Sequence, residues 1–378
     1  MKGTIRRRGK RSWEIKYDLP RDHQTGQRRT AYKTVKGLRA DAERELRAIL
    51  SRMDRGVLIE PTKITVGEYL DEWLDKSAPR TVAPVSLQRY HSLSRNQIKP
   101  HLGTIPLQRL RPADIDGWLQ NLIEAGNLST RTIRHAHGVL RRALAHATAI
   151  EIIERNVASI IKPPTLQKTE MAILTAGEIS ETLARMKGHS LYPIIALAIG
   201  TGARRGEIAA LRWVDINLDG AAMRIERSLE QTKGALRVKL PKTAAGRRTV
   251  SLPAFAVAAL RDHRRQQLEL RLQLGLGTLP PDFPVFGNHE GDWPKPYSIS
   301  DRWRDAVRNR KLPKVTFHGL RHSHASALIA AGLDVVTVSR RLGHASPALT
   351  LGTYSHLFKN NDAEAAAAID AALGGNIE

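Results

Sequence analysis

The N-terminal sixty residues change from an alternating pattern to a helical one. Residues 13–17 alternate apolar and polar side chains, and residues 29–35 do so again after a Thr-Gly pair. A period of two residues is typical of half-buried strands, so this stretch predicts a hairpin. From Arg39 onward the apolar side chains recur at helical spacing, at Ala42, Leu46, Ile49 and Leu50. Residues 1–60 therefore predict a small β-sheet plus one helix.

Residues 64–162 carry helical patterns with no convincing strand between them. The stretch 56–63 contains Pro61 and has the composition of a linker, and Thr65 resembles a helix N-cap. Helical periods then run over residues 84–98, 112–125 and 129–147. We expect an all-helical domain here.

After Pro163-Pro164 the helical and strand-like patterns mix. Short strands are expected over residues 223–226, 236–240 and 248–252. The alanine-rich stretch 363–373 favours a terminal helix. Residues 170–378 should thus form an α+β domain with a C-terminal tail helix, and the chain as a whole is multidomain.

Charge indicates the kind of partner. The 378 residues include 60 Lys and Arg against 37 Asp and Glu, a formal net charge of +23, which suits nucleic acid. The first sixty residues alone hold 17 Lys and Arg against 8 acidic residues. Their basic run consists of Arg6, Arg7, Arg8, Lys10 and Arg11.

Two absences in the sequence narrow the function further. No stretch approaches the roughly 20 apolar residues of a membrane-spanning helix, and the N-terminus lacks an apolar signal core, so we expect a soluble, cytoplasmic protein with no membrane partner. The chain has no cysteine, which excludes disulfides, thiolate metal sites and cysteine nucleophiles. Covalent chemistry must therefore use oxygen or nitrogen.

The segment TGARRGE at residues 201–207 places Arg204 at the start of a helical run. A guanidinium there can grip a phosphate with its planar fork while backbone N–H groups assist. A solvated surface arginine explains this segment equally well when it is taken alone. Glu207, three residues later, can orient the arginine or simply pair with it.

The segment PKT at residues 241–243 lies between two predicted strands, where a turn presents the ammonium of Lys242. A lysine can protonate a leaving oxygen when nearby cations lower its pKa. Most lysines in turns are only solvated. Lys242 is therefore a catalytic candidate only because of the other motifs in this domain.

The segment HGLRH at residues 318–322 puts His318 and Arg321 on one face at the start of a helix. A rival interpretation takes His318 and His322, four residues apart, as a metal-binding pair. The segment has no carboxylate partner and the chain has no cysteine, so we expect no metal site.

The segment LGHAS contains His344, and a Thr-Tyr pair ends at Tyr354, ten residues beyond that histidine. A tyrosine near several cations can act as a phenoxide nucleophile at neutral pH. As a lone residue, Tyr354 would more often be a core ring with a satisfied hydroxyl. Its context favours the nucleophile.

Taken together, TGARRGE, PKT, HGLR, LGH and TY resemble, in order and spacing, the catalytic signature of the tyrosine recombinases, the phage-integrase family. The resemblance is strong over about residues 170–358 and looser over 66–162, which looks like the family's helical core-binding, SAM-like domain. Residues 1–60 look like its arm-binding module, a three-stranded sheet with a helix. The resemblance implies a site-specific DNA recombinase that integrates or excises a phage or mobile element through a 3′-phosphotyrosyl intermediate.

The resemblance also implies a role for each candidate cation. Arg204 and Arg321 would clamp the scissile phosphate, and Glu207 would be a supporting carboxylate. Two guanidiniums would neutralise the non-bridging oxygens and stabilise the five-coordinate transition state.

The remaining roles concern the movement of protons. Tyr354 would attack phosphorus, His318 would accept the phenolic proton, Lys242 would protonate the departing 5′ oxygen, and His344 would hydrogen-bond a phosphate oxygen. Because the bond energy stays in the phosphotyrosyl link, no cofactor and no metal are expected.

The partners implied are double-stranded DNA with core and arm attachment sites, three further copies of the chain in a tetramer on that DNA, and an accessory DNA-bending or excision-directing protein. The setting would be the nucleoid in the cytoplasm of a bacterial host. It is equally consistent that the aromatics of the N-terminal sheet read DNA or that they form the module's own core. The DNA-binding candidates there are Arg6, Arg7, Arg8, Lys10, Arg11, Trp13, Tyr17, Arg28, Arg29 and Tyr32.

Two alternatives remain open. Residues 334–354 also read as helix, Gly-containing turn and helix, which is typical of a non-catalytic helix-turn-helix regulator. That interpretation leaves Arg204, Lys242 and His318 unexplained. A topoisomerase would use the same tyrosyl chemistry, but the arm-like N-terminal module has no obvious use in one.

Overall fold

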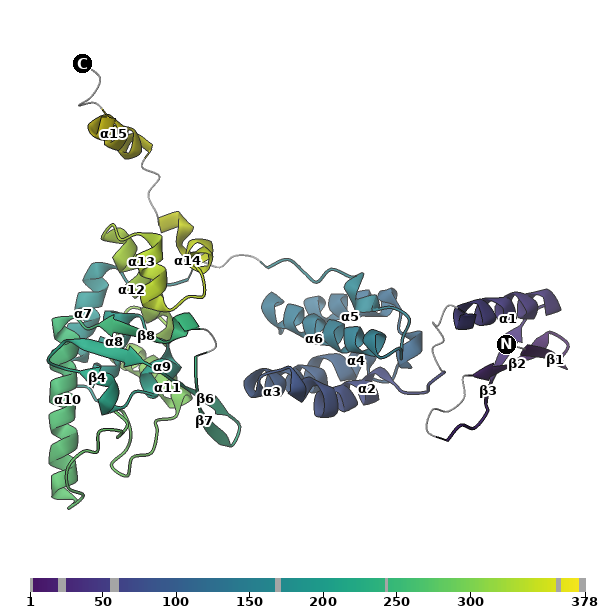
Figure 1. Cartoon of the computed structure of the whole chain (residues 1–378), viewed down its shortest axis with the longest axis horizontal. Helices are drawn as coiled ribbons and strands as arrows, with labels where there is room; N and C mark the ends of the chain where they lie inside the picture. Colours follow the sequence, from purple (N-terminus) through teal and green to yellow (C-terminus); the bar gives the residue numbers. More distant parts are fainter. Residues whose placement is uncertain are drawn as a thin grey trace. The chain divides into compact units, whose positions relative to one another are not determined.

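The computed structural model describes residues 3–19, 25–54, 61–166, 171–241, 244–357 and 362–373. The chain divides into two compact units, Met1–Gln167 and Lys168–Glu378 (Figure 1). The first unit contains a small sheet and a group of helices, and the second mixes helices with short strands. This matches the multidomain fold class expected from the sequence.

A three-stranded antiparallel sheet and one helix begin the chain. Ile15 and Tyr17 of the central strand are buried in one cluster with Ala42 and Ile49 of the helix. The predicted hairpin and helix are confirmed. The pattern did not predict the first strand, because its consecutive arginines interrupt the alternation of apolar and polar residues. The elements are β1 (Gly3–Gly9), β2 (Ser12–Leu19), β3 (Arg29–Lys36) and α1 (Arg39–Asp54).

The rest of the first unit is helical, as expected. Thr65 caps the first helix: its hydroxyl accepts the Glu68 N–H at 3.2 Å, and the Glu68 carboxylate accepts the Thr65 N–H at 2.8 Å. Leu70, Trp118 and Leu140 lie in the core of this helical part. Residues 56–60 of the predicted linker lie outside the described residues. The helices are α2 (Val66–Glu72), α3 (Pro84–Leu93), α4 (Lys99–Leu102), α5 (Pro112–Glu124) and α6 (Thr130–Ala149), with π-helical turns at Trp73–Ser77 and Ser94–Ile98.

No helix in the described residues of the chain has the length and apolar character needed to cross a membrane.

The second unit has two small sheets among its helices. The strands are β4 (Ile216–Asn217), β5 (Ala222–Ile225), β6 (Ser228–Thr232), β7 (Ala235–Lys239) and β8 (Arg248–Ser251). The helices are α7 (Ala176–Met186), α8 (Tyr192–Thr201), α9 (Arg205–Ala209), α10 (Ala254–Gln273), α11 (Pro296–Asn309), α12 (Phe317–Ala330), α13 (Val335–Leu342), α14 (Pro347–Tyr354) and α15 (Asp362–Leu373).

The strands pair as two antiparallel sheets, β4-β5-β8 and β6-β7. The three predicted strands appear as β5, β7 and β8, and the predicted tail helix appears as α15. Two strands escaped prediction. β4 has only two residues, and β6 has the sequence SLEQT, in which Leu229 alone is buried, so neither shows an alternating pattern.

Helix α8 forms the centre of the second unit and positions the site. Its sequence YPIIALAIGT is apolar on every side, which is typical of a helix surrounded by protein. It packs against α10 and α12. Helices α12, α13 and α14 lie together at one end of this unit (Figure 1). The C-terminal end of α8 therefore meets the start of α12 and the turn that follows α13.

Candidate active site

Arg204 stands at the junction between α8 and α9. Gly202 ends α8 in the left-handed conformation, with φ +63°, and Arg204 is the N-cap of α9. Glu207 accepts the Arg204 backbone N–H at 2.9 Å and its Nη1 at 2.7 Å. The Arg204 side chain is 42% exposed, so part of its guanidinium faces solvent while Glu207 fixes the rest.

Glu207 is a buried carboxylate held by two arginines. Arg248 of β8 donates Nη2 to Glu207 Oε2 at 3.0 Å, and its side chain is only 8% exposed. Burial by itself raises the pKa of Glu207, but the charge and hydrogen bond of Arg248, followed by the charge of Arg204, outweigh it and lower the pKa. Glu207 is therefore ionised, and it orients Arg204 rather than only neutralising it.

Arg321 on α12 is the most deeply buried cation of the cluster, with 4% exposure. Its Nη1 donates to the carbonyl of Gly202 at 2.7 Å and its Nη2 to the carbonyl of Leu342 at 2.8 Å. Burial and then the charge of Arg204 lower the pKa of Arg321 to about 9, so it keeps its proton at neutral pH. Two carbonyls fix the fork in one orientation.

Two left-handed glycines supply carbonyls to the two arginines. Gly202 ends α8 and accepts from Arg321, while Gly343 ends α13 at φ +66° and accepts Arg204 Nη2 at 3.1 Å. A Cβ on Gly343 would lie 2.5 Å from Arg248 Nη1, and one on Gly202 would lie 2.6 Å from the ring of His324. Both positions therefore require glycine for conformation and for space.

His318 lies near the start of α12 and is exposed. Partial desolvation, then the charges of Arg321 and Arg204, lower its pKa. Its ring contacts the ring of His322 edge to face, with 4.7 Å between centroids. The charges of Arg204 and Arg321 therefore both act on this imidazole, which is neutral at pH 7.

Tyr354 is the last residue of α14 and is 3% exposed. Its hydroxyl lies 2.5 Å from Nδ1 of His322, which is also buried. Burial raises the pKa of Tyr354 to about 12, although Arg321 opposes this. In this state the phenol is protonated and enclosed, whereas the cationic surroundings suggested a phenoxide.

His344 follows Gly343 in the turn between α13 and α14. Its Nδ1 lies 2.8 Å from the hydroxyl of Thr350. Burial, then the charges of Arg321 and Arg204, lower the pKa of His344 to about 4. The ring is neutral at pH 7, and one nitrogen is engaged with Thr350.

The structure brings Arg204, Glu207, Arg321, His344 and Tyr354 together as expected, but it does not place every candidate. Lys242 lies outside the described residues. In the part of the chain that is described, no three His, Cys, Asp or Glu side chains are grouped as metal ligands, and His322 is engaged with Tyr354.

The candidates in the N-terminal sheet divide between its two faces. Tyr17 is buried, and Trp13 packs with it against α1. Tyr32 is 56% exposed on the opposite face, where Lys16 lies 5.8 Å from its ring centre. The exposed cations among the candidates are Arg6, Arg7, Arg8, Lys10, Arg11 and Arg28, while Arg29 is half-buried.

Two of these cations already have acidic neighbours. Arg8 pairs with Glu14 at 2.8 Å, and Arg28 pairs with Asp18 at 2.8 Å. A phosphate would have to compete for these two guanidiniums.

Sequence reasoning missed two residues of the cluster. Arg248 was placed only as the start of a strand, because nothing in the local pattern shows that its side chain turns inward to Glu207. His322 was considered only as half of a metal pair. The one available signal was its position next to Arg321 at the start of a predicted helix.

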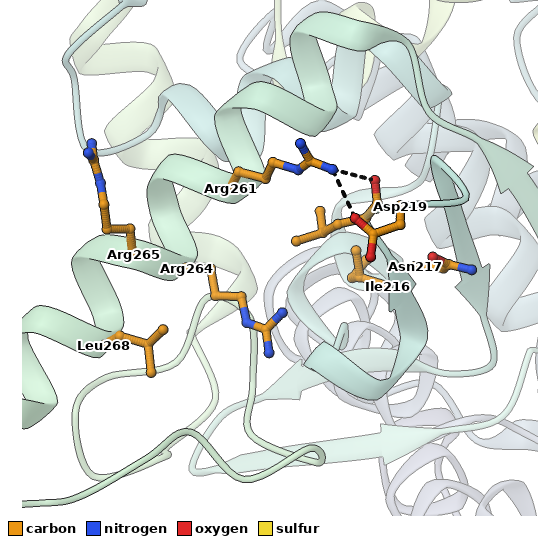
Figure 2. Close-up of a pocket in the computed structure, with 8 residues that line it drawn as sticks. Ile216, Asn217, Asp219, Arg261, Arg264, Arg265 and Leu268 are labelled. Atoms are coloured by element: carbon orange, nitrogen blue, oxygen red, sulfur yellow. Dashed lines mark hydrogen bonds and ion pairs between the residues drawn. The ribbon is translucent and has the colours of Figure 1, made fainter.

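A shallow groove of about 580 Å³ lies elsewhere on the second unit, between residues 216–219 and α10. Figure 2 shows Arg261 turned toward Asp219, to which it donates at 3.0 Å. Arg264 lies over the ring of Trp213 at 5.5 Å. None of the candidate catalytic residues lines this groove.

The match to a known family covers that cluster. Residues 172–361, half of the chain, match the phage integrase family, and residues 65–123 match the N-terminal SAM-like domain of phage integrases. The chain belongs to the phage integrase family. The matched residues run from before Arg204 to beyond Tyr354, so the family segment contains the whole cluster, and the family recognition made from the sequence is confirmed.

Curated relatives of this integrase-family chain are similar along most of their length. It is 26% identical over 336 residues to a tyrosine recombinase XerC-like protein of Caldanaerobacter subterraneus subsp. tengcongensis, covering 84% of this chain and 85% of that one. It is 29% identical over 330 residues to an integrase of Streptomyces ambofaciens, with 84% and 82% covered. The ICEBs1 integrase of Bacillus subtilis is 27% identical, with 88% of each chain covered.

Solved structures show the same fold. The Tn1549 transposon integrase in complex with a circular intermediate DNA superposes with a TM-score of 0.65 at 18% identity, covering 82% of this chain and 99% of that one. A lambda integrase tetramer bound to a Holliday junction gives 0.58 at 20% identity, with 95% of each chain covered. The family fold thus extends through both units.

Proposed function

We propose that this integrase-family chain is a site-specific recombinase that cleaves and rejoins DNA through a 3′-phosphotyrosyl intermediate, integrating or excising a phage or mobile element. One observation carries the proposal: Arg321 joins the end of α8 to the end of α13 through two carbonyls, and thereby gathers Arg204 and Tyr354 into one cluster. The names of the relatives, which are integrases and recombinases, support it.

The two guanidiniums are suited to one phosphodiester. Each arginine is fixed by carbonyls or by Glu207, so its orientation is set before DNA binds. Pre-oriented donors stabilise the extra charge of a five-coordinate phosphorus without reorganisation when the reaction occurs. His344 is proposed to hydrogen-bond a phosphate oxygen with the nitrogen that does not contact Thr350.

The cleavage step follows from these positions. Tyr354 Oη forms a bond to phosphorus and the bond to the 5′ oxygen breaks. The phenolic proton passes to a histidine of α12, and the departing 5′ oxygen takes a proton that we assign to Lys242. Attack by a 5′ hydroxyl of another strand reverses each transfer and releases Tyr354.

The partners follow the division of the chain. We assign core-site binding to residues 64–162 together with the catalytic domain, 170–378, and arm-site binding to residues 1–60. A basic chain with charge +23 neutralises phosphates wherever it contacts a duplex. Two strand exchanges between two duplexes need four nucleophiles, so we propose a homotetramer on DNA, helped by an accessory bending or excision-directing protein in the bacterial cytoplasm.

The test is capture of the covalent intermediate. The protein is incubated with labelled nicked duplexes that carry the junction sequence of its element, in EDTA, and then denatured in SDS. Wild type should give labelled protein, and Tyr354→Phe should give none while still binding the DNA. Tyr192→Phe, a change of the same size at a partly buried ring on α8, should form the adduct like wild type.

A labelled adduct in the Tyr354→Phe protein would remove the assigned nucleophile. Tight binding without any adduct in wild type would favour the regulator, for which α13, the turn at Gly343 and α14 supply a helix, a turn and a helix.

A further inference from the structure

His322 is the group that contacts the nucleophile. It follows Arg321 on α12, is 9% exposed, and places Nδ1 2.5 Å from Tyr354 Oη. The two rings are tilted by 51°, with 5.6 Å between centroids. The contact joins α12 to the end of α14, at the point where the tyrosine must be released or activated.

His318 lies one helical turn earlier and has a different position. Its ring contacts the His322 ring edge to face. None of the hydrogen bonds in the described part of the chain joins His318 to Tyr354. A proton acceptor must lie within hydrogen-bond reach of the proton it takes. In the resting protein His322 satisfies this condition.

The direction of the hydrogen bond follows from burial. His322 Nδ1 is the hydrogen-bond partner that the described residues give to the buried Tyr354 hydroxyl, so the phenol O–H donates and Nδ1 accepts. His322 then carries its proton on Nε2. Both side chains are neutral, which is the state that a buried pair beside Arg321 favours.

We propose that His322 takes the phenolic proton when Tyr354 attacks phosphorus, and that before DNA binds it holds the tyrosine in its buried, protonated form. The proposal rests on the recombinase function proposed above and names a further catalytic residue for it.

The proton balance is complete in both directions. As the Oη–phosphorus bond forms, the O–H bond breaks, the proton moves to Nδ1, and His322 becomes imidazolium. When a 5′ hydroxyl later attacks the phosphotyrosine, His322 returns the proton to the departing phenolate. One residue thus acts as base in cleavage and as acid in rejoining.

Burial of both rings keeps the proton on the tyrosine until DNA arrives. The groups that face His322 are His318 and Arg321 on α12, His344 in the turn before α14, and Tyr354 itself. Burial, then His318 and Arg321, lower the pKa of His322 to about 4, and burial raises that of Tyr354 to about 12. A phosphodiester between the arginines adds negative charge that favours imidazolium, so transfer is coupled to DNA binding.

The experiment compares rates of covalent adduct formation on the nicked duplex. His322→Asn keeps an acceptor near the Nδ1 position but cannot take a proton. General-base removal should slow the adduct by about 100-fold or more with unchanged DNA affinity. Replacing Tyr354 by 3,5-difluorotyrosine, whose phenol is more acidic, should restore at least about 10-fold of the loss in His322→Asn. Tyr192→Phe, on α8 and outside the cluster, is the comparison and should form the adduct at the wild-type rate.

Each outcome decides. A His322→Asn protein as fast as wild type, or slow but not rescued by difluorotyrosine, overturns the proposal while the wild-type adduct still supports the recombinase. Absence of the adduct in wild type contradicts the recombinase itself. If the variant does not fold, nitrogen NMR of histidine-labelled wild type reports the tautomer, and a proton on Nδ1 of His322 overturns the proposal.

Discussion

Glu207 and Arg248 form a buried ion pair at 3.0 Å, with side-chain exposures of 4% and 8%. Arg248 also donates Nε to the carbonyl of Arg341 at 2.8 Å, so one guanidinium joins β8, α9 and α13. Glu207 passes this constraint to Arg204. The orientation of Arg204 therefore depends on a residue outside the sequence motifs.

Arg248→Met should destabilise the second unit and disorient Arg204. Removing one partner of a buried ion pair costs about 3–5 kcal/mol, because the other charge stays buried. We expect a lower denaturant midpoint and, in the folded fraction, slower adduct formation. Arg261→Met is the matched control: its pair with Asp219 is exposed and should contribute about 1 kcal/mol or less. Equal effects of the two changes would contradict the role of Arg248.

Gly343→Ala should be more damaging than Gly332→Ala. Both glycines have positive φ, +66° and +82°, so both substitutions carry the same kind of backbone strain, about 1 kcal/mol. Only at Gly343 would the new Cβ meet Arg248 Nη1, at 2.5 Å, whereas around Gly332 nothing lies within 4 Å. Thermal unfolding and adduct rates of the two variants should be compared. Gly332→Ala shows the effect of backbone strain alone, and the additional loss in Gly343→Ala shows the effect of displacing the Gly343 carbonyl that accepts from Arg204.

The stability of the second unit should fall in mild acid because of His324. This ring is 6% exposed, contacts the Ile199 carbonyl through Nδ1 at 2.7 Å, and accepts Arg341 Nε at 3.1 Å. Burial and then Arg341 lower its pKa to about 4. The unfolded chain, with an ordinary histidine pKa of about 6.5, binds the extra proton, so this contribution is full above pH 6.5 and is lost as the pH falls toward 4.

The measurement is urea unfolding between pH 4 and 7. One titrating histidine adds a slope of at most about 1.4 kcal/mol per pH unit in this window. His324→Gln cannot titrate, so its stability should vary less with pH than that of wild type. An unchanged slope would show that His324 titrates alike in both states.

The sequence predicted elements and motifs well where the signal is local. Helical period, the Thr65 cap and three strands appear where expected, because burial of one face requires that periodicity. The motif residues Arg204, Glu207 and Arg321 also lie together. The contacts of Arg248 and His322 could not be predicted from the sequence pattern. They depend on how β8, α12 and α14 pack together, and the spacing of residues along the chain does not specify that packing.

The faces of the N-terminal sheet show the same limit. Trp13, Tyr17 and Tyr32 look alike as aromatic residues on strands, yet strand register decides their roles. Tyr32 pairs with Lys16, which points away from α1, whereas Tyr17 points toward it. The sequence left open whether each ring binds DNA or packs in the core. A shift of one residue along a strand moves a side chain from the buried face to the exposed face.

Tyr32 and Tyr17 therefore give opposite predictions. Tyr17→Ala removes a ring that is 4% exposed in a small core and should cost about 3–5 kcal/mol, unfolding the module. Tyr32→Ala removes a ring that is 56% exposed and should leave stability within about 0.5 kcal/mol. If the outer face of the sheet contacts arm DNA, Tyr32→Ala should nevertheless weaken binding of arm-site duplex by about 10-fold.

Circular dichroism and fluorescence anisotropy separate the two effects. Lys33→Ala is a useful control, since Lys33 pairs with Glu45 of α1 at 2.5 Å on the inner side of the sheet and should affect arm binding less than Tyr32→Ala. Wild-type arm affinity in Tyr32→Ala, with loss of affinity in variants of the basic run that begins at Arg6, would mean that the arginines alone hold the phosphates and that the exposed ring has no part in the contact.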